Sequence, residues 1–210
     1  MIEYREAKIA EDERLAKLAT ESFGDYPFYS FALKDSFRSD RDYRAYMEKL
    51  NLIELRANMR GQKCFVGTVD GEIVSAALLQ DPQKPKIGIW QYLRSGAGKL
   101  IFPVGLGRIL DFFSMTEEAR SDCEKQCPDS WYLDMLVVNG SMKGRSLGSR
   151  MLQECVIPYV RAHGGKSLSL ITNTDGNRRF YARNGFSEFA ERKLTRCGNS
   201  IMNWSFVHAL

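Results

Sequence analysis

The sequence lacks the residue patterns that mark a metal centre or a disulfide framework. Its 210 residues include five cysteines, an odd number, and none belongs to a C-x-x-C pair. Zinc sites and disulfide scaffolds both show such regular cysteine pairing. Histidine, another common metal ligand, occurs only twice. We therefore expect reduced thiols and no metal site.

Long apolar runs and a strong charge of one sign are missing as well. No window reaches the ~18 uninterrupted apolar residues that a membrane span requires, and residues 1–19 are charged throughout without an apolar leader segment. The formal net charge of +4 comes from 30 basic and 26 acidic residues that are interleaved along the chain. These absences predict a cytoplasmic protein with no membrane and no nucleic-acid partner.

The composition that is present suits one globular core. Hydrophobic residues make up 44% of the chain, and the six prolines are scattered. No segment is biased enough in composition to predict disorder. We expect residues 1–210 to form a single domain, as a monomer or a homodimer.

The first half of the chain alternates between the two hydrophobic periods. A short strand is expected at 2–5, helices at 11–22 and 40–60, and a β-hairpin at 63–80 that turns at Asp70-Gly71. Residues 84–130 are read as a strand end, a loop and a helix from about 106 to 125.

The second half begins with a βαβ pattern. A strand at 131–138, a helix at 146–164 and a strand at 167–172 have the lengths that a parallel pairing needs. A short helix at 177–184 and strands at 186–195 and 200–209 follow. The fold class is therefore α/β (α+β), with a mixed central sheet of six or seven strands flanked by about four helices.

A glycine- and serine-rich segment, KGRSLGS at 143–149, lies where the 131–138 strand leads into a helix. Such a turn can direct several backbone N–H groups at an anion, and the helix dipole adds positive potential. The segment matches neither a dinucleotide fingerprint nor a P-loop. Taken alone it also fits an ordinary surface turn in which Ser146 caps the helix.

A second motif decides between these readings. The segment NRRFYARNGF fits the pattern Asn-x-x-(Phe/Leu)-Tyr-x-(Lys/Arg)-x-Gly-Phe through six residues: Asn177, Phe180, Tyr181, Arg183, Gly185 and Phe186. Together with LVV at 136–138 and the 143–149 loop, it resembles the GNAT family of acetyl-CoA-dependent N-acetyltransferases. The stretch FGDYPFYSFAL at 23–33 is similar to members that resemble puromycin N-acetyltransferase.

The resemblance implies a coenzyme A site. In that family two parallel strands splay apart, the backbone of the first receives the pantetheine arm, and a Gln/Arg-x-x-Gly-x-Gly/Ala loop holds the pyrophosphate. Lys and Ser replace the usual residues at two of these loop positions, which predicts weaker preorganisation. The implied cofactor-binding residues are Leu136, Val137, Val138, Lys143, Gly144, Arg145, Ser146, Leu147, Gly148, Ser149, Asn173, Asn177 and Tyr181.

The resemblance also implies catalytic roles. Tyr181 matches the tyrosine that can protonate the departing thiolate, since a phenol is neutral at pH 7; the alternative is an aromatic packing residue. Asp134 lies where some members carry a base that acts through water, and strand alternation would place it on one face with Leu136 and Val138. It could instead be a structural carboxylate. Asn177 could equally be the N-cap of the helix that carries Tyr181.

The acceptor pocket is expected among the aromatic residues of 26–37 and 87–113. Phe28, Tyr29, Trp90 and Tyr92 would line it, although aromatic residues at this density also suit a core. The implied function is direct transfer of an acetyl group to a primary amine of a small molecule. Two alternatives stay open: a non-catalytic acyl-CoA-binding sensor or docking domain, and a protein N-terminal or lysine acetyltransferase. The 84–130 segment would tend to close the groove that a peptide needs.

Overall fold

The computed structural model describes residues 1–142 and 145–210 and contains a seven-stranded sheet in the order β1-β2-β3-β4-β5-β7-β6. Only β4 and β5 pair in parallel among these neighbours. The expected mixed sheet is confirmed. Its strands are β1 (Glu3–Glu6), β2 (Lys63–Val69), β3 (Glu72–Gln80), β4 (Trp131–Val138), β5 (Ser167–Thr172), β6 (Ser187–Arg196) and β7 (Asn199–Ala209).

Helices in the described ranges are more numerous than the four or so expected, because several are too short to show a clear period in the sequence. They are α1 (Asp12–Phe23), α2 (Pro27–Leu33), α3 (Asp40–Met59), α4 (Ile89–Arg94), α5 (Gly98–Val104), α6 (Leu106–Gln126), α7 (Leu147–Met151), α8 (Ile157–Ala162) and α9 (Asp175–Arg183). In residues 1–142 and 145–210, no helix combines the length and the apolarity that crossing a lipid bilayer takes.

The segment from 84 onward departs from the expected strand end. It runs irregularly to Gly88 and then forms α4 and α5, which pack beside α3. The aromatic and β-branched residues of IWQYLR favour a strand intrinsically, but contacts with α3 decide the local structure. The expected hairpin at 63–80 does form, with Asp70 at φ 50° and Gly71 at φ 78° in its turn.

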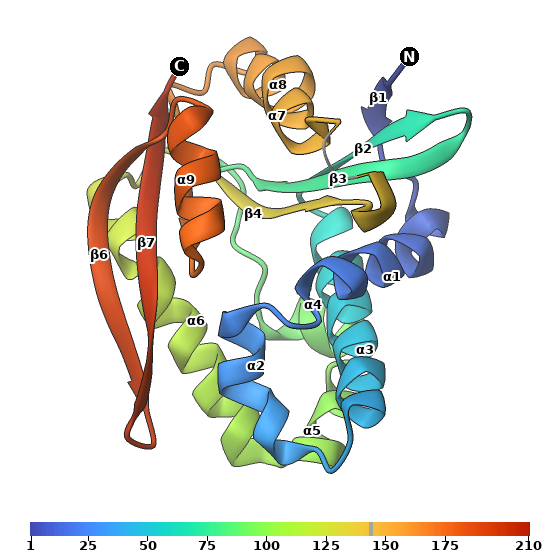
Figure 1. Cartoon of the computed structure of the whole chain (residues 1–210), viewed down its shortest axis with the longest axis vertical. Helices are drawn as coiled ribbons and strands as arrows, with labels where there is room; N and C mark the ends of the chain where they lie inside the picture. The colour runs from blue at the N-terminus through green and yellow to red at the C-terminus, as the bar shows by residue number, and fades with distance from the viewer. Residues whose placement is uncertain (143–144) are drawn as a thin grey trace.

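Two helical layers enclose the sheet. Figure 1 shows α7 and α8 on one side of β2–β4 and α1 and α3 on the other, with α9 beside β7. The cores follow the same division: Leu133 and Met151 belong to the α7–α9 side, whereas Leu55 and Met135 belong to the α1–α3 side. A third cluster joins α2, α3, α5 and α6 to the β6 side of the sheet.

The middle of β4 contains a β-bulge at Asp134. Leu79 of β3 pairs with Leu133 and the adjacent Leu78 pairs with Met135, so Asp134 has no partner on β3. A bulge inserts one residue and reverses the alternation beyond it. Leu136 therefore packs with the α7–α9 core, while Asp134 faces α6. The expectation that Asp134 shares a face with Leu136 and Val138 is wrong for this reason.

The parallel pairing of β4 with β5 is brief. It joins Trp131 to Leu168 and Tyr132 to Ser169, and no further pair follows among the described residues. Beyond Tyr132 the two strands separate, as the family resemblance implied.

The start of this pairing depends on Gly165. A Cβ at this position would lie 2.4 Å from Val160 Cγ1 and 2.7 Å from Trp131 Cδ1. Gly165→Ala is expected to destabilise the fold by about 1–3 kcal/mol, because the added methyl overpacks the junction. Thermal unfolding measures this.

Gly107→Ala is the matched control, since nothing lies within 4 Å of a Cβ there and the residue is in α6. It should leave stability unchanged or raise it by about 0.5–1 kcal/mol. Equal melting temperatures for the two variants would contradict the role of Gly165.

Candidate active site

A cavity of about 460 Å³ lies where β4 and β5 separate. Its walls come from both sheet halves and from five helices, α1–α3, α6 and α9, with Tyr92 of α4 closing one side. Several residues that the sequence singled out meet in it: Phe28, Tyr29, Tyr92, Asp134, Leu136, Asn173, Asn177 and Tyr181.

Tyr181 reaches the cavity from α9, and only 8% of it is exposed. Its hydroxyl makes no hydrogen bond to any residue in the described ranges. Burial raises the pKa of the Tyr181 phenol above its ordinary value, so the group keeps its proton at neutral pH. A protonated hydroxyl that opens onto a cavity is suited to donate a proton.

Helix α9 begins with Thr174 as its N-cap, and not with Asn177. The Asn177 backbone N–H donates to Thr174 Oγ1 at 3.1 Å. The alternative reading of Asn177 as the cap is therefore wrong, because Asn177 is already inside the helix. Its side chain is left to line the cavity.

The end of β5 is fastened on two sides. Asn173 Nδ2 donates to the Met202 carbonyl at 2.8 Å and to Asn203 Oδ1 at 3.1 Å, which ties it to β7. Its backbone N–H donates to the Tyr26 hydroxyl at 2.8 Å. Asn173 thus borders the cavity with its amide nitrogen already engaged. Tyr26, which the sequence did not single out, links α2 to this edge.

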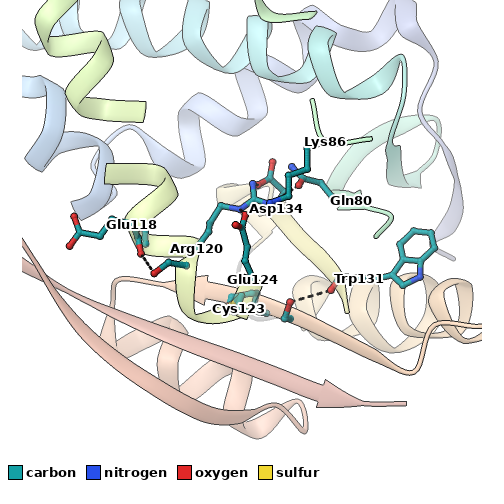
Figure 2. A network of polar contacts seen from close by, with 12 residues as sticks. Gln80, Lys86, Glu118, Arg120, Cys123, Glu124, Trp131 and Asp134 are labelled. Atoms are coloured by element: carbon teal, nitrogen blue, oxygen red, sulfur yellow. Dashed lines mark hydrogen bonds and ion pairs between the residues drawn. The ribbon is translucent and has the colours of Figure 1, made fainter. Parts of the chain in front are cut away.

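Asp134 is held by an arginine from α6. Arg120 Nη1 donates to Asp134 Oδ1 at 3.4 Å, and the two side chains are 17% and 16% exposed. Arg120 Nη2 also donates to Gln80 Oε1 at 2.6 Å, and the guanidinium carbon lies 4.0 Å from the centroid of the Tyr132 ring. Figure 2 shows Arg120 reaching toward Asp134 with Gln80 alongside. Burial raises the pKa of Asp134, and Arg120 opposes this shift.

Glu54 is a further carboxylate in the cavity wall, which Glu117 and Glu124 of α6 also line, and the sequence analysis missed it. It lies on α3, where Met47 and Leu50 are buried seven and four residues earlier. This spacing puts Glu54 on the apolar stripe of the helix. An acidic residue on that stripe was the available signal.

Of the four aromatic residues predicted to line the acceptor pocket, three line the cavity and one does not. Phe28 and Tyr29 of α2 and Tyr92 of α4 line the cavity, whereas Trp90 is 72% exposed and lies outside it. Residues two apart point the same way in a strand and nearly opposite ways in a helix. Because this segment forms α4 and not a strand end, Tyr92 points inward and Trp90 points to solvent.

The expected pyrophosphate loop leads into α7. Lys143 and Gly144 lie outside the described residues, and Arg145 is exposed. Ser146 has a left-handed backbone, φ 53°, and its side chain makes no capping hydrogen bond. The reading of Ser146 as a side-chain cap is therefore wrong, because the left-handed backbone does not direct its hydroxyl at the helix.

The first turn of α7 packs closely on α9. A Cβ at Gly148 would lie 3.0 Å from Phe180 Cζ and 3.8 Å from Val138 Cγ1. Leu147 is buried, and Ser149 is partly exposed. The two sequence motifs, 143–149 and 177–186, thus meet in space through Gly148 and Phe180.

Comparisons with known proteins agree with this arrangement. The family model described as the acetyltransferase (GNAT) family matches residues 18–186. No curated protein sequence matches the chain.

Many solved structures share the fold. A Drosophila melanogaster polyamine N-acetyltransferase is 20% identical over the full length of both chains, with a TM-score of 0.62. An agmatine N-acetyltransferase mutant is 18% identical over 100% of this chain and 99% of its own, with a TM-score of 0.61. A Corynebacterium glutamicum protein described as histone acetyltransferase HPA2 and related acetyltransferase is 15% identical over 97% of this chain and 94% of its own, with a TM-score of 0.64.

The likeness of residues 23–33 to puromycin-type members stays a prediction. The family match covers most of the chain and includes β4, the α7 loop and α9. This chain therefore belongs to the GNAT family of acetyltransferases, acyltransferases that use acetyl-CoA.

Proposed function

We propose that this protein transfers an acetyl group from acetyl-CoA directly to a primary amine of a small molecule. The observation that carries the proposal is the cavity at the β4–β5 separation, whose wall contains Tyr181, Asn177 and Asp134. A concave pocket with a few convergent polar groups is the usual form of a small-molecule site.

The residues present fit coenzyme A. Beyond Tyr132, β4 has no strand partner on its β5 side within the described residues, so Leu136, Val137 and Val138 can offer backbone groups there. Arg145 and Ser146 lead into α7, and Leu147, Gly148 and Ser149 form its start, where the helix dipole favours an anion. Acetyl-CoA would supply the acetyl group in activated thioester form.

Each polar residue of the cavity has a separate role in the proposed reaction. The Tyr181 hydroxyl donates a proton to the leaving sulfur, and Asn177 orients the bound chain from the first turn of α9. Asp134, with Arg120, contributes a fixed charge pair beside the acceptor. Phe28, Tyr29 and Tyr92 exclude water around the reacting amine.

A small acceptor is favoured over a protein. Helices α4 and α6 supply Tyr92, Phe112 and Phe113 to the cavity wall, which narrows the open groove that an extended peptide would need. Two fold neighbours are named as polyamine and agmatine acetyltransferases. At their identities they share the fold alone, so they serve here to choose test compounds.

The proposal is tested by calorimetry with acetyl-CoA, followed by thiol release with a panel of amines that includes agmatine and spermidine. Binding together with thiol release for at least one amine supports it. Binding without release for any amine would point to an acyl-CoA sensor. Absence of binding would contradict both functions.

Tyr181→Phe should lower turnover by about 10²–10³-fold, because the proton donor to the thiolate is lost. The affinity for acetyl-CoA and the melting temperature should stay close to wild type, since the hydroxyl makes no hydrogen bond in the described structure. Steady-state kinetics and calorimetry measure these. Unchanged turnover would remove Tyr181 from the mechanism.

Ser146→Gly should stabilise the protein by up to about 1 kcal/mol, because glycine adopts the left-handed backbone of residue 146 without strain. The affinity for acetyl-CoA should be equal or higher. Ser149→Gly is the control: its residue lies within α7, so glycine there should destabilise by about 0.5–1 kcal/mol. Losses of equal size in both variants would contradict the assignment of strain to Ser146.

A further inference from the structure

Glu54 and Asp134, two of the carboxylates that line the cavity, have different partners. Of the others, Glu124 pairs with Lys86 and Arg120, and Glu117 is exposed. Asp134 lies beside Arg120, whose guanidinium is fixed by Gln80 and by the face of Tyr132. A positively charged partner at this distance neutralises much of the carboxylate charge. Asp134 is therefore poorly placed to attract another cation.

Glu54 is bound only by neutral donors. Its Oε1 accepts a hydrogen bond from the Tyr92 hydroxyl at 3.0 Å and another from Asn58 Nδ2 at 2.8 Å. No Lys, Arg or His nitrogen in the described part of the chain lies within 4.0 Å of its oxygens. The charge of this carboxylate is therefore not balanced by a direct ion pair.

The second oxygen of Glu54 is free. Within residues 1–142 and 145–210, Oε2 accepts no hydrogen bond, and it is not fully buried. Since Glu54 lines the cavity, the accessible side of this oxygen is the cavity side. Oε2 is thus open to a donor brought by a ligand.

Titratable groups face Glu54 from four other elements. These are Tyr29 of α2, Tyr92 of α4, Arg120 of α6 and Asp134 of β4. Lys86, and Glu117 and Glu124 of α6, line the same cavity. Burial, and then the negative charge of Asp134, raise the pKa of Glu54 to about 7, while Tyr92, Arg120 and Asn58 lower it. A carboxyl with this pKa exchanges a proton readily at neutral pH.

We propose that Glu54 is a catalytic residue that receives the acceptor as an ammonium ion and removes its proton, with Asp134 serving to hold Arg120. This inference rests on the proposed acetyltransferase function. It also defines the acceptor as an amine that is cationic in solution, because the unpaired carboxylate recognises an N–H⁺ donor.

The proton account balances over one turnover. One proton passes from the ammonium nitrogen to Glu54 Oε2 and from there to solvent. The neutral amine then forms a C–N bond to the acetyl carbon as the C–S bond breaks. The Tyr181 hydroxyl gives its proton to the sulfur and regains one from the acylated nitrogen.

Glu54→Gln is the test, because it keeps the shape and an oxygen that Tyr92 and Asn58 can reach. With the most active amine of the panel, kcat/KM near pH 7 should fall at least 100-fold. The inflection in the wild-type profile of kcat/KM against pH that follows protonation of Glu54 should disappear in the variant, whose kcat/KM then rises steadily with pH as the free amine loses its proton. The affinity for acetyl-CoA should change less than threefold.

Asp134→Asn is the matched comparison. It removes the carboxylate beside Arg120 and should retain the inflection due to Glu54, moved to lower pH because the charge of Asp134 no longer raises the pKa of Glu54. Any rate loss should be expressed mainly in kcat. Loss of that inflection in Asp134→Asn, with its retention in Glu54→Gln, would overturn the proposal. A wild-type protein that releases no thiol with any amine would instead defeat the proposed function.

A second readout needs no turnover. Because the pKa of Glu54 is raised, the folded state binds more protons than the unfolded chain between the unfolded and folded pKa values, and stability falls as pH rises through about 7. Glu54→Gln should remove this contribution, so the variant should gain melting temperature relative to wild type at pH 8 and not at pH 5. An equal shift at both pH values would contradict an ionising Glu54.

Discussion

The separation of β4 from β5 after two residue pairs is the constraint on which the rest of the structure depends. A continuous sheet would satisfy its backbone groups internally and leave no room between the strands. Here the pairing stops at Tyr132 and Ser169, and the sheet opens into a cavity. The helices around this opening supply most of the side chains that line the cavity.

The position of Arg120 determines which carboxylate of the cavity has a positively charged partner. Arg120 enters from α6 and lies against Tyr132, where it faces Asp134 and leaves Glu54 without a direct cation. Asp134 therefore has a positively charged partner, whereas Glu54 accepts hydrogen bonds only from the neutral donors Tyr92 and Asn58. The two carboxylates thus differ in electrostatic environment within one cavity. Separate environments for paired carboxylates are a general route to distinct acid and base roles.

The parts of this architecture with local signals could be predicted from the sequence. The Asp70-Gly71 turn, the strand at 131–138 and the motif around Tyr181 are all written in consecutive residues, and their elements are present. Trp90 and Glu54 escaped for a common reason. Whether Trp90 faces the cavity depends on α4 packing on α3, and the place of Glu54 depends on which face of α3 meets the sheet. Local spacing carries no sign of the first contact, and for Glu54 it shows only that an acidic residue lies on the apolar stripe of α3, not what that residue faces.

The bulge in β4 has a consequence for comparing this chain with its relatives. Because Asp134 adds one residue without lengthening the pairing with β3, the side chains before and after it follow opposite parities. In a relative without the extra residue, an alignment would pair residues that face the same way as Leu133 and as Leu136 only if a one-residue gap were placed between these two positions. An ungapped alignment would equate inward residues with outward ones across half the strand. The residue of a relative that is equivalent to Asp134 should therefore be assigned from the pairing of β4 with β3 and not from an ungapped sequence alignment.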